Sequence, residues 1–124
     1  YVTGSNNCAW ALDARTGRPF WEYRRNLPSD LTYGALAPVN RGFAIHGNLL
    51  YMTTLDAHLL AFDRRTGGVV WDVRLANYRE GYAGTLAPLV VDAGTRKPNF
   101  VAMTTWLRTG ASASPTSVSL VCGP

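Results

Sequence analysis

The sequence predicts an all-β fold, and three observations indicate it. The chain repeats itself at an offset of 50 residues, one segment of the repeat alternates apolar and polar residues, and no stretch carries a helical period of convincing length. A period of about 50 residues with turn signals is typical of propeller blades, which are four-stranded antiparallel sheets. We therefore expect a fragment of a β-propeller, with about one complete four-stranded blade, parts of two neighbours and an irregular C-terminal tail.

The internal repeat aligns residues 1–25 with residues 51–75. Nine of the 25 aligned positions are identical, which is hard to obtain by chance. The densest part reads A-x-D-x-R-T-G-x-x-x-W in both copies, as ALDARTGRPFW and as AFDRRTGGVVW. The identical pairs are Tyr1/Tyr51, Thr3/Thr53, Ala11/Ala61, Asp13/Asp63, Arg15/Arg65, Thr16/Thr66, Gly17/Gly67, Trp21/Trp71 and Arg24/Arg74.

The second copy indicates how one blade is built. In residues 69–75 apolar side chains alternate with Asp72 and Arg74, the period of a half-buried strand. Residues 63–68 form a polar hairpin turn, in which Asp can bond to its own backbone and Gly can adopt a positive φ. Further strands are expected over residues 43–46, 48–54 and 58–62, and more weakly over residues 19–24.

A tryptophan recurs at the same place in both copies, as Trp21 and Trp71. We expect each indole to lie flat between blades, on the glycine turn of the next repeat, with its ring N–H bonded to a backbone acceptor. Gly17 and Gly67 then leave room for a ring. The alternative is that both tryptophans are ordinary core aromatics.

Charge and hydropathy exclude two classes of protein. The net charge is +4, but adjacent basic residues occur only as isolated pairs, Arg24-Arg25, Arg64-Arg65 and Arg96-Lys97, so no nucleic-acid partner is expected. The longest apolar runs are a few residues, far below the roughly 18 of a membrane-spanning helix, so the chain is not expected to be an integral membrane protein.

Few residues suggest metal or acid–base chemistry. Cys8 and Cys122 are too few and too distant in sequence for a disulfide framework or a metal cluster. His46 and His58 lack a metal-ligand spacing and are expected to be structural, and Asp56 is expected to be a turn residue. No catalytic residue and no metal ligand is therefore assigned in this chain.

The doubled motif resembles the tryptophan-docking repeat of the pyrroloquinoline quinone (PQQ) dehydrogenases. Residues 39–45, 54–59 and 81–91 also look like the early blades of the quinoprotein alcohol dehydrogenases. The resemblance covers residues 1–91 and implies an eight-bladed propeller that binds PQQ and a calcium or lanthanide ion.

The resemblance implies two cofactor-binding residues, Arg41 and Thr85. In that family an Arg at the place of Arg41 reaches a carboxylate or quinone oxygen of PQQ, and a Thr at the place of Thr85 bonds to PQQ from the neighbouring blade. A guanidinium suits this tricarboxylate because it makes charge-assisted, often paired hydrogen bonds. The alternatives are a surface arginine beside a turn and an ordinary strand threonine.

Two departures from the family pattern stand out. Residues 35–38 read Ala-Leu-Ala-Pro, where the family usually carries adjacent cysteines. Residues 92–124 carry no acid after Asp92, although the family continues with a Glu that coordinates the metal. We therefore expect residues 92–124 to be a divergent tail, from a truncated gene or a shifted reading frame.

The resemblance implies a periplasmic enzyme that oxidises an alcohol by hydride transfer to PQQ and passes electrons to a cytochrome. This chain holds at most Arg41 and Thr85 of that machinery, so by itself we expect it to be inactive. The alternative is a non-catalytic propeller scaffold for protein–protein interaction, such as an outer-membrane assembly lipoprotein.

Overall fold

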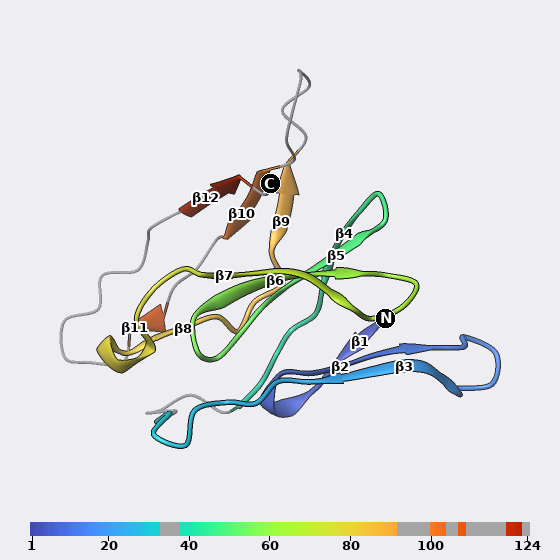
Figure 1. Cartoon of the computed structure of the whole chain (residues 1–124), viewed down its shortest axis with the longest axis horizontal. Coiled ribbons are helices and arrows are strands. Elements are labelled where there is room, and N and C mark those ends of the chain that lie inside the picture. Colours follow the sequence, from blue (N-terminus) through green and yellow to red (C-terminus); the bar gives the residue numbers. More distant parts are fainter. Residues whose placement is uncertain (33–37, 92–99, 104–106, 109–118, 123–124) are drawn as a thin grey trace.

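The computed structural model describes the backbone of residues 1–32, 38–91, 100–103, 107–108 and 119–122, and the side chains of residues 1–32 and 38–90. Regular structure in these ranges consists of short β-strands and two 3-10 turns, Ser5–Asn7 and Tyr78–Glu80 (Figure 1). The all-β class is therefore confirmed. None of the described residues belongs to a helix long and apolar enough to span a bilayer.

Two antiparallel sheets follow the internal repeat. The first, called the first blade, has the order β1-β2-β3 and contains β1 (Val2–Thr3), β2 (Cys8–Leu12) and β3 (Pro19–Arg24). The second blade has the order β4-β5-β6-β7 and contains β4 (Ala44–His46), β5 (Leu49–Thr53), β6 (His58–Asp63) and β7 (Val69–Arg74). The strands expected in the second blade are present with ends that differ by one residue, and this blade is complete.

The hairpin turns of the two blades have the same construction. The Asp63 carboxylate accepts the backbone N–H groups of Arg65 and Thr66 over 2.8 and 3.1 Å, and these bonds lower the pKa of Asp63. Gly67 has a φ of 73°, and the β6–β7 register shifts at a bulge beside the turn. The first blade repeats the φ of 73° at Gly17 and the bulge between β2 and β3.

The core lies on the two faces of the second blade, both of which are packed. One face of the second blade packs against the first blade, in a cluster of Ala9, Ala11, Trp21, Leu50, Met52, Leu60 and Phe62. The opposite face carries Tyr51, Leu59 and Ala61, with Trp71 and Val90 against them. A strand buried on both faces is apolar throughout rather than alternating, which explains the continuous run of residues 59–62.

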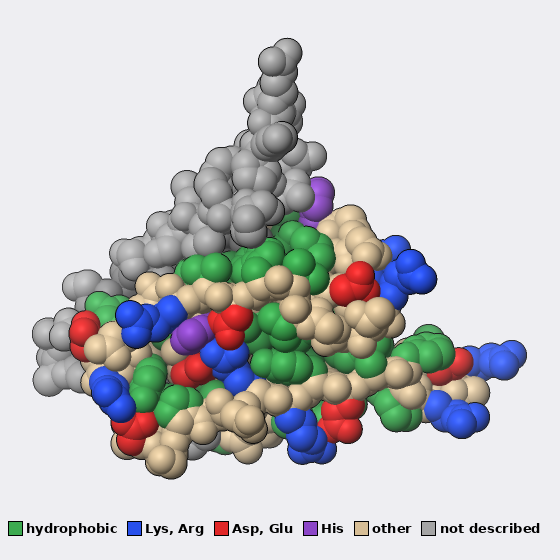
Figure 2. All heavy atoms as spheres, in the orientation of Figure 1, with side chains coloured by type: hydrophobic (Ala, Val, Ile, Leu, Met, Phe, Trp, Pro, Cys, Tyr) green, Lys and Arg blue, Asp and Glu red, His purple; other side chains and the backbone are tan. Residues whose placement is uncertain are grey.

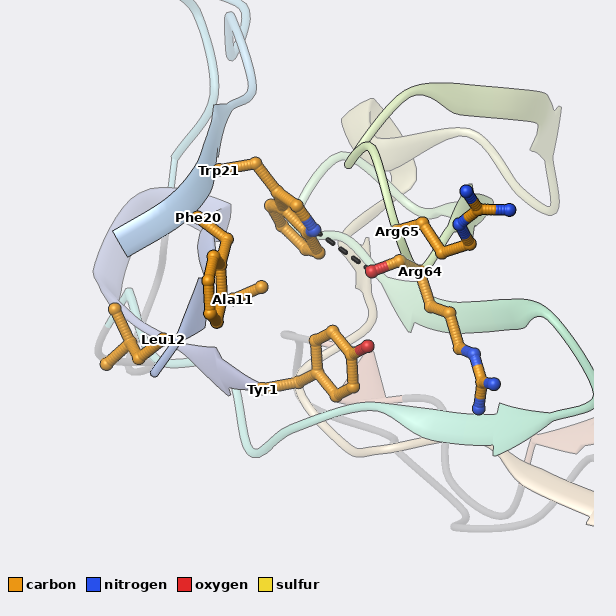
Figure 3. A pocket seen from close by; sticks show the side chains of 7 residues that line it. All are labelled: Tyr1, Ala11, Leu12, Phe20, Trp21, Arg64 and Arg65. Carbon is orange, nitrogen blue, oxygen red and sulfur yellow. Dashed lines mark hydrogen bonds between the residues drawn. The ribbon is translucent and has the colours of Figure 1, made fainter. Parts of the chain in front are cut away.

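Trp21 makes the joint expected from the repeat. Its ring N–H donates to the carbonyl oxygen of Arg64 over 3.0 Å (Figure 3). A Cβ placed on Gly67 would lie 2.5 Å from the indole Cδ2, so the ring fits only because this residue is glycine. Trp71 contacts Tyr51 of its own blade, with ring centroids 5.8 Å apart, and a glycine turn against the Trp71 ring stays a prediction.

Strands beyond β7 form two further small sheets. Strand β9 (Leu89–Val91) pairs with β10 (Phe100–Met103), which pairs with β12 (Ser119–Cys122), and β8 (Tyr82–Ala83) pairs with β11 (Leu107–Arg108). The segment expected to be an irregular tail, residues 92–124, thus contains three short strands where the structure describes it. Its remaining positions, and residues 35–37 of the Ala-Leu-Ala-Pro departure, lie outside the described residues.

Candidate cofactor-binding site

Arg41 and Thr85 lie in the segments that lead into the first strands of two successive sheets. Arg41 precedes β4 and Thr85 precedes β9, and these two strands lie next to each other. Nη1 of Arg41 donates to Oγ1 of Thr85 over 2.8 Å, and the backbone N–H of Arg41 donates to the Thr85 carbonyl oxygen over 3.0 Å. The fold therefore brings together two residues that are 44 positions apart.

The chemistry of this pair suits an anionic or carbonyl-bearing ligand. Thr85 is 7% exposed, whereas Arg41 is exposed, and among the described residues no carboxylate forms an ion pair with Arg41. A guanidinium has five N–H donors, and a hydroxyl that accepts one bond still has its own O–H to donate. Arg41 and Thr85 can therefore present several donors to one oxygen-rich group, which fits a carboxylate or quinone oxygen of PQQ.

A second polar cluster lies between the blades, and sequence reasoning missed it. The Arg25 guanidinium bonds both carboxylate oxygens of Asp56 at 2.7 to 2.9 Å, and it also bonds Asp72 at 2.9 Å. The side chains of Arg25 and Asp56 are only 10% and 7% exposed. Nδ1 of His58 lies 2.6 Å from the Asp72 carboxylate. The expected turn position of Asp56 is correct, but its carboxylate also pairs with the preceding blade.

The charges in this cluster stabilise one another. Burial acts to lower the pKa of Arg25, but its hydrogen bonds to Asp56 and Asp72 outweigh burial and the pKa is raised. Burial acts to raise the pKa of Asp56, but hydrogen bonds from Arg25 and Thr54 outweigh it and the pKa is lowered. The repeat contained a signal for this pair. Arg25 and Asp56 align with the uncharged residues Leu75 and Asn6, so neither charge is part of the shared repeat pattern. Each charge occurs in one copy alone.

Neither cluster has the composition of a metal centre. Within the part of the chain that the structure describes, no three His, Cys, Asp or Glu side chains gather closely enough to hold a metal ion. Figure 2 shows basic and acidic side chains interspersed over the visible face.

An open cavity of about 380 Å³ lies at the joint between the two blades (Figure 3). Its walls combine aromatic and arginine side chains and include Trp21, which makes the interblade joint. The lining residues are Tyr1, Ala11, Leu12, Phe20, Trp21, Arg64 and Arg65. Neither Arg41 nor Thr85 lines this cavity, so it is separate from the candidate site.

Comparison with known proteins identifies relatives of most of this chain. The PQQ_2 family model, described as outer membrane protein assembly factor BamB, matches residues 1–105. Quinoprotein alcohol dehydrogenase PedH of Pseudomonas putida is 44% identical over 92 residues, which are 74% of this chain and 15% of PedH. The 1-butanol dehydrogenase (quinone) of Thauera butanivorans is 43% identical over 91 residues, 73% of this chain and 14% of that protein.

Solved structures of quinoprotein dehydrogenases also superpose on this chain. A quinohemoprotein alcohol dehydrogenase from Comamonas testosteroni superposes with a TM-score of 0.68 and 28% identity, covering 86% of this chain and 15% of that structure. A europium-containing methanol dehydrogenase superposes with a TM-score of 0.68 and 26% identity, covering 98% of this chain and 22% of that structure. The chain therefore spans about 15% of the length of the curated relatives it matches.

Proposed function

Because the chain belongs to the PQQ-type propeller family that includes the quinoprotein alcohol dehydrogenases, we propose that it forms part of a PQQ-dependent alcohol dehydrogenase. In this proposal Arg41 and Thr85 bind the cofactor. The observation that carries it is the 2.8 Å hydrogen bond from Arg41 to Thr85, which joins the two residues that the family resemblance selects independently.

The two residues have distinct tasks in this proposal. The redox chemistry would be that of bound PQQ, with the cofactor as the hydride acceptor in alcohol oxidation. Arg41 would bind a carboxylate or quinone oxygen of the cofactor. Thr85, whose hydroxyl oxygen accepts from Arg41, would fix the direction of that guanidinium and donate its own O–H to the cofactor. A calcium or lanthanide ion accompanies the cofactor in the complete protein, with ligands from outside the described residues. The chain by itself is then inactive.

The electron acceptor and the compartment are extensions of the same proposal. A relative 37% identical over 93 residues is named 1-butanol dehydrogenase (cytochrome c), which supports a cytochrome as the partner. We assign the complete protein to the periplasm, where cell fractionation would recover it with periplasmic markers. Recovery with cytoplasmic markers would contradict this assignment.

The proposed division of the chain is residues 1–91 as propeller repeats and residues 92–124 as a divergent tail. The curated alignments to PedH and the butanol dehydrogenase cover 74% and 73% of the chain, whereas the family model extends to residue 105. Translation of the parent DNA in its other two frames tests the origin of the tail. A frame that restores a strand followed by a glycine cluster with Glu supports a shifted frame, and two frames without it reject that origin.

A non-catalytic scaffold is the second candidate. The description of the matching family model, an outer membrane protein assembly factor, favours it. A scaffold has no tricarboxylate to bind, so Arg41 would there serve only to join two segments through its hydrogen bond to Thr85.

Isothermal titration of the complete protein with PQQ, with and without calcium, separates the two functions. Wild type should bind PQQ, and Arg41→Ala should weaken binding about 10-fold or more, because a hydrogen bond to a charged group contributes about 1.5–3 kcal/mol. Arg74→Ala, at an exposed arginine of β7, is the matched control and should bind as wild type does. A wild type that binds no PQQ in either condition supports the scaffold instead.

A further inference from the structure

Thr53 contacts both segments of the candidate site. It ends β5 and is 1% exposed. Its carbonyl oxygen accepts the side-chain amide of Asn40 over 2.8 Å, and its hydroxyl donates to the carbonyl oxygen of Leu86 over 2.6 Å. Asn40 directly precedes Arg41, and Leu86 directly follows Thr85. A single buried residue thus holds the neighbour of each proposed cofactor ligand.

Asn40 fixes the backbone on both sides of Arg41. Its Nδ2 donates to Thr53, and its Oδ1 accepts the backbone N–H of Gly42 over 3.0 Å. The Asn40 side chain therefore closes a short loop of which Arg41 is the central residue. Gly42 has a φ of 119°, a conformation that favours glycine, so this loop has a defined shape.

Gly84 sets how closely Thr85 approaches the second blade. The backbone N–H of Gly84 donates to the carbonyl oxygen of Thr54 over 2.9 Å. A Cβ at Gly84 would lie 2.6 Å from Cβ of Thr53, so the two residues pack in direct contact. Thr85 is therefore held at a fixed distance from the end of β5.

The repeat uses the equivalent threonine in a similar way. Thr3 aligns with Thr53, and its hydroxyl donates to the carbonyl oxygen of Asn40 over 3.3 Å. The hydroxyl at this strand end therefore reaches, in both copies, the segment that leads into the next sheet. The backbone carbonyl of Asn40 accepts the hydroxyl of Thr3, and its side-chain amide donates to the carbonyl of Thr53.

We infer that Asn40 and Thr53 are positioning residues for the cofactor: they hold Arg41 and Thr85 at the mutual distance that binds PQQ. This inference rests on the proposed function of Arg41 and Thr85. Neither Asn40 nor Thr53 needs to touch the cofactor. Both act through the residues on either side of them, since a donor pair binds most tightly when it is fixed before the ligand arrives.

A purely structural role predicts a different pattern. If Thr53 serves only to join the sheets, removal of its hydroxyl should lower stability and leave PQQ affinity intact in the folded protein. Thr54 provides the matched control, because it is also buried but its hydroxyl bonds His58 within its own turn.

The experiment measures PQQ affinity by titration and thermal unfolding of the cofactor-free complete protein. Thr53→Val should weaken PQQ binding about 3- to 10-fold, the effect of one hydrogen bond. Thr54→Val should lower the unfolding temperature about as much as Thr53→Val does, since each removes one buried hydroxyl. It should nevertheless keep PQQ affinity within about 2-fold of wild type. Thr53→Ser retains the hydroxyl and should restore binding. Asn40→Asp, which places an oxygen against the Thr53 carbonyl, should weaken binding at least as much as Thr53→Val.

The outcomes separate the two proposals. If wild type binds PQQ and Arg41→Ala weakens it, but Thr53→Val and Asn40→Asp bind as wild type does, the positioning inference is overturned and the proposed function stands. If Thr53→Val fails to fold, Asn40→Asp alone decides in the same way. A wild type that binds no PQQ overturns both proposals. Equal losses of affinity in Thr53→Val and Thr54→Val also overturn the inference, because they indicate a general loss of structure.

Discussion

The ring N–H of Trp21 donates a hydrogen bond to the carbonyl oxygen of Arg64 over 3.0 Å, and this bond joins the last strand of one blade to the hairpin turn of the next. The same indole lies against Gly67, three residues further along that turn. The joint therefore has two requirements, a backbone acceptor and a position without a side chain. The requirement for a position without a side chain can be tested, because Gly17 occupies the equivalent position in the first blade.

Gly67→Ala should destabilise the chain more than Gly17→Ala. Both glycines have a φ of 73°, so each substitution costs about 1–2 kcal/mol from left-handed backbone conformation alone. Only at Gly67 does the new methyl group meet the Trp21 ring, whereas nothing lies within 4 Å of the Gly17 position. Overpacking of this kind costs about 1–3 kcal/mol more. Urea unfolding followed by tryptophan fluorescence measures the difference, and equal midpoints for the two variants would contradict the proposed joint.

Arg25→Met should be among the most damaging substitutions outside the apolar core. It leaves the Asp56 carboxylate buried without its partner, and breaking a buried ion pair in this way costs about 3–5 kcal/mol. The double variant Arg25→Met/Asp56→Leu should recover much of that loss, since it removes the uncompensated charge. A double-mutant cycle from urea midpoints measures the coupling. Additive losses would show that the two side chains do not stabilise each other.

Asp72 is the comparison within the same cluster. Its side chain is 38% exposed, so its bond to Arg25 competes with water. Asp72→Asn should therefore cost less than about 1 kcal/mol. A loss as large as that of Arg25→Met would mean that Asp72, rather than Asp56, is the principal partner of Arg25.

Acid should weaken the contact between blades through Asp56. Its pKa is lowered in the folded chain, so its contribution to stability is fully present above the pKa of an unfolded aspartate, about 3.9. The contribution is lost as the pH falls through the lowered folded-state pKa. The urea midpoint of wild type should therefore fall more steeply below about pH 4 than that of Asp56→Asn. Asp13, Asp30 and Asp63 also have lowered pKa values but remain in both proteins. Parallel pH curves would contradict the role of Asp56.

Local patterns predicted the blade because they depend on neighbouring residues. The alternation of residues 69–75 and the Asp63–Gly67 turn each depend on residues a few positions apart in the sequence. The turn motif also occurs in both copies of the repeat. The Arg25–Asp56 pair was missed because its partners are 31 positions apart and neither has a local signature. The contacts of Thr53 were missed for a further reason: its carbonyl accepts from Asn40 and its hydroxyl donates to the Leu86 carbonyl, and main-chain atoms leave no trace in a sequence. Arg41 and Thr85 were identified from family resemblance, since spacing alone does not bring them together.

The prevalence of main-chain acceptors at these joints bears on how such a chain diverges. Trp21 bonds the carbonyl of Arg64, Thr3 that of Asn40 and Thr53 that of Leu86, and every residue type supplies the same carbonyl. A duplicated unit can therefore dock on its sibling before any side chain at the receiving position has adapted. Such a bond sets no requirement on the receiving side chain, whereas it does require the donating tryptophan or threonine.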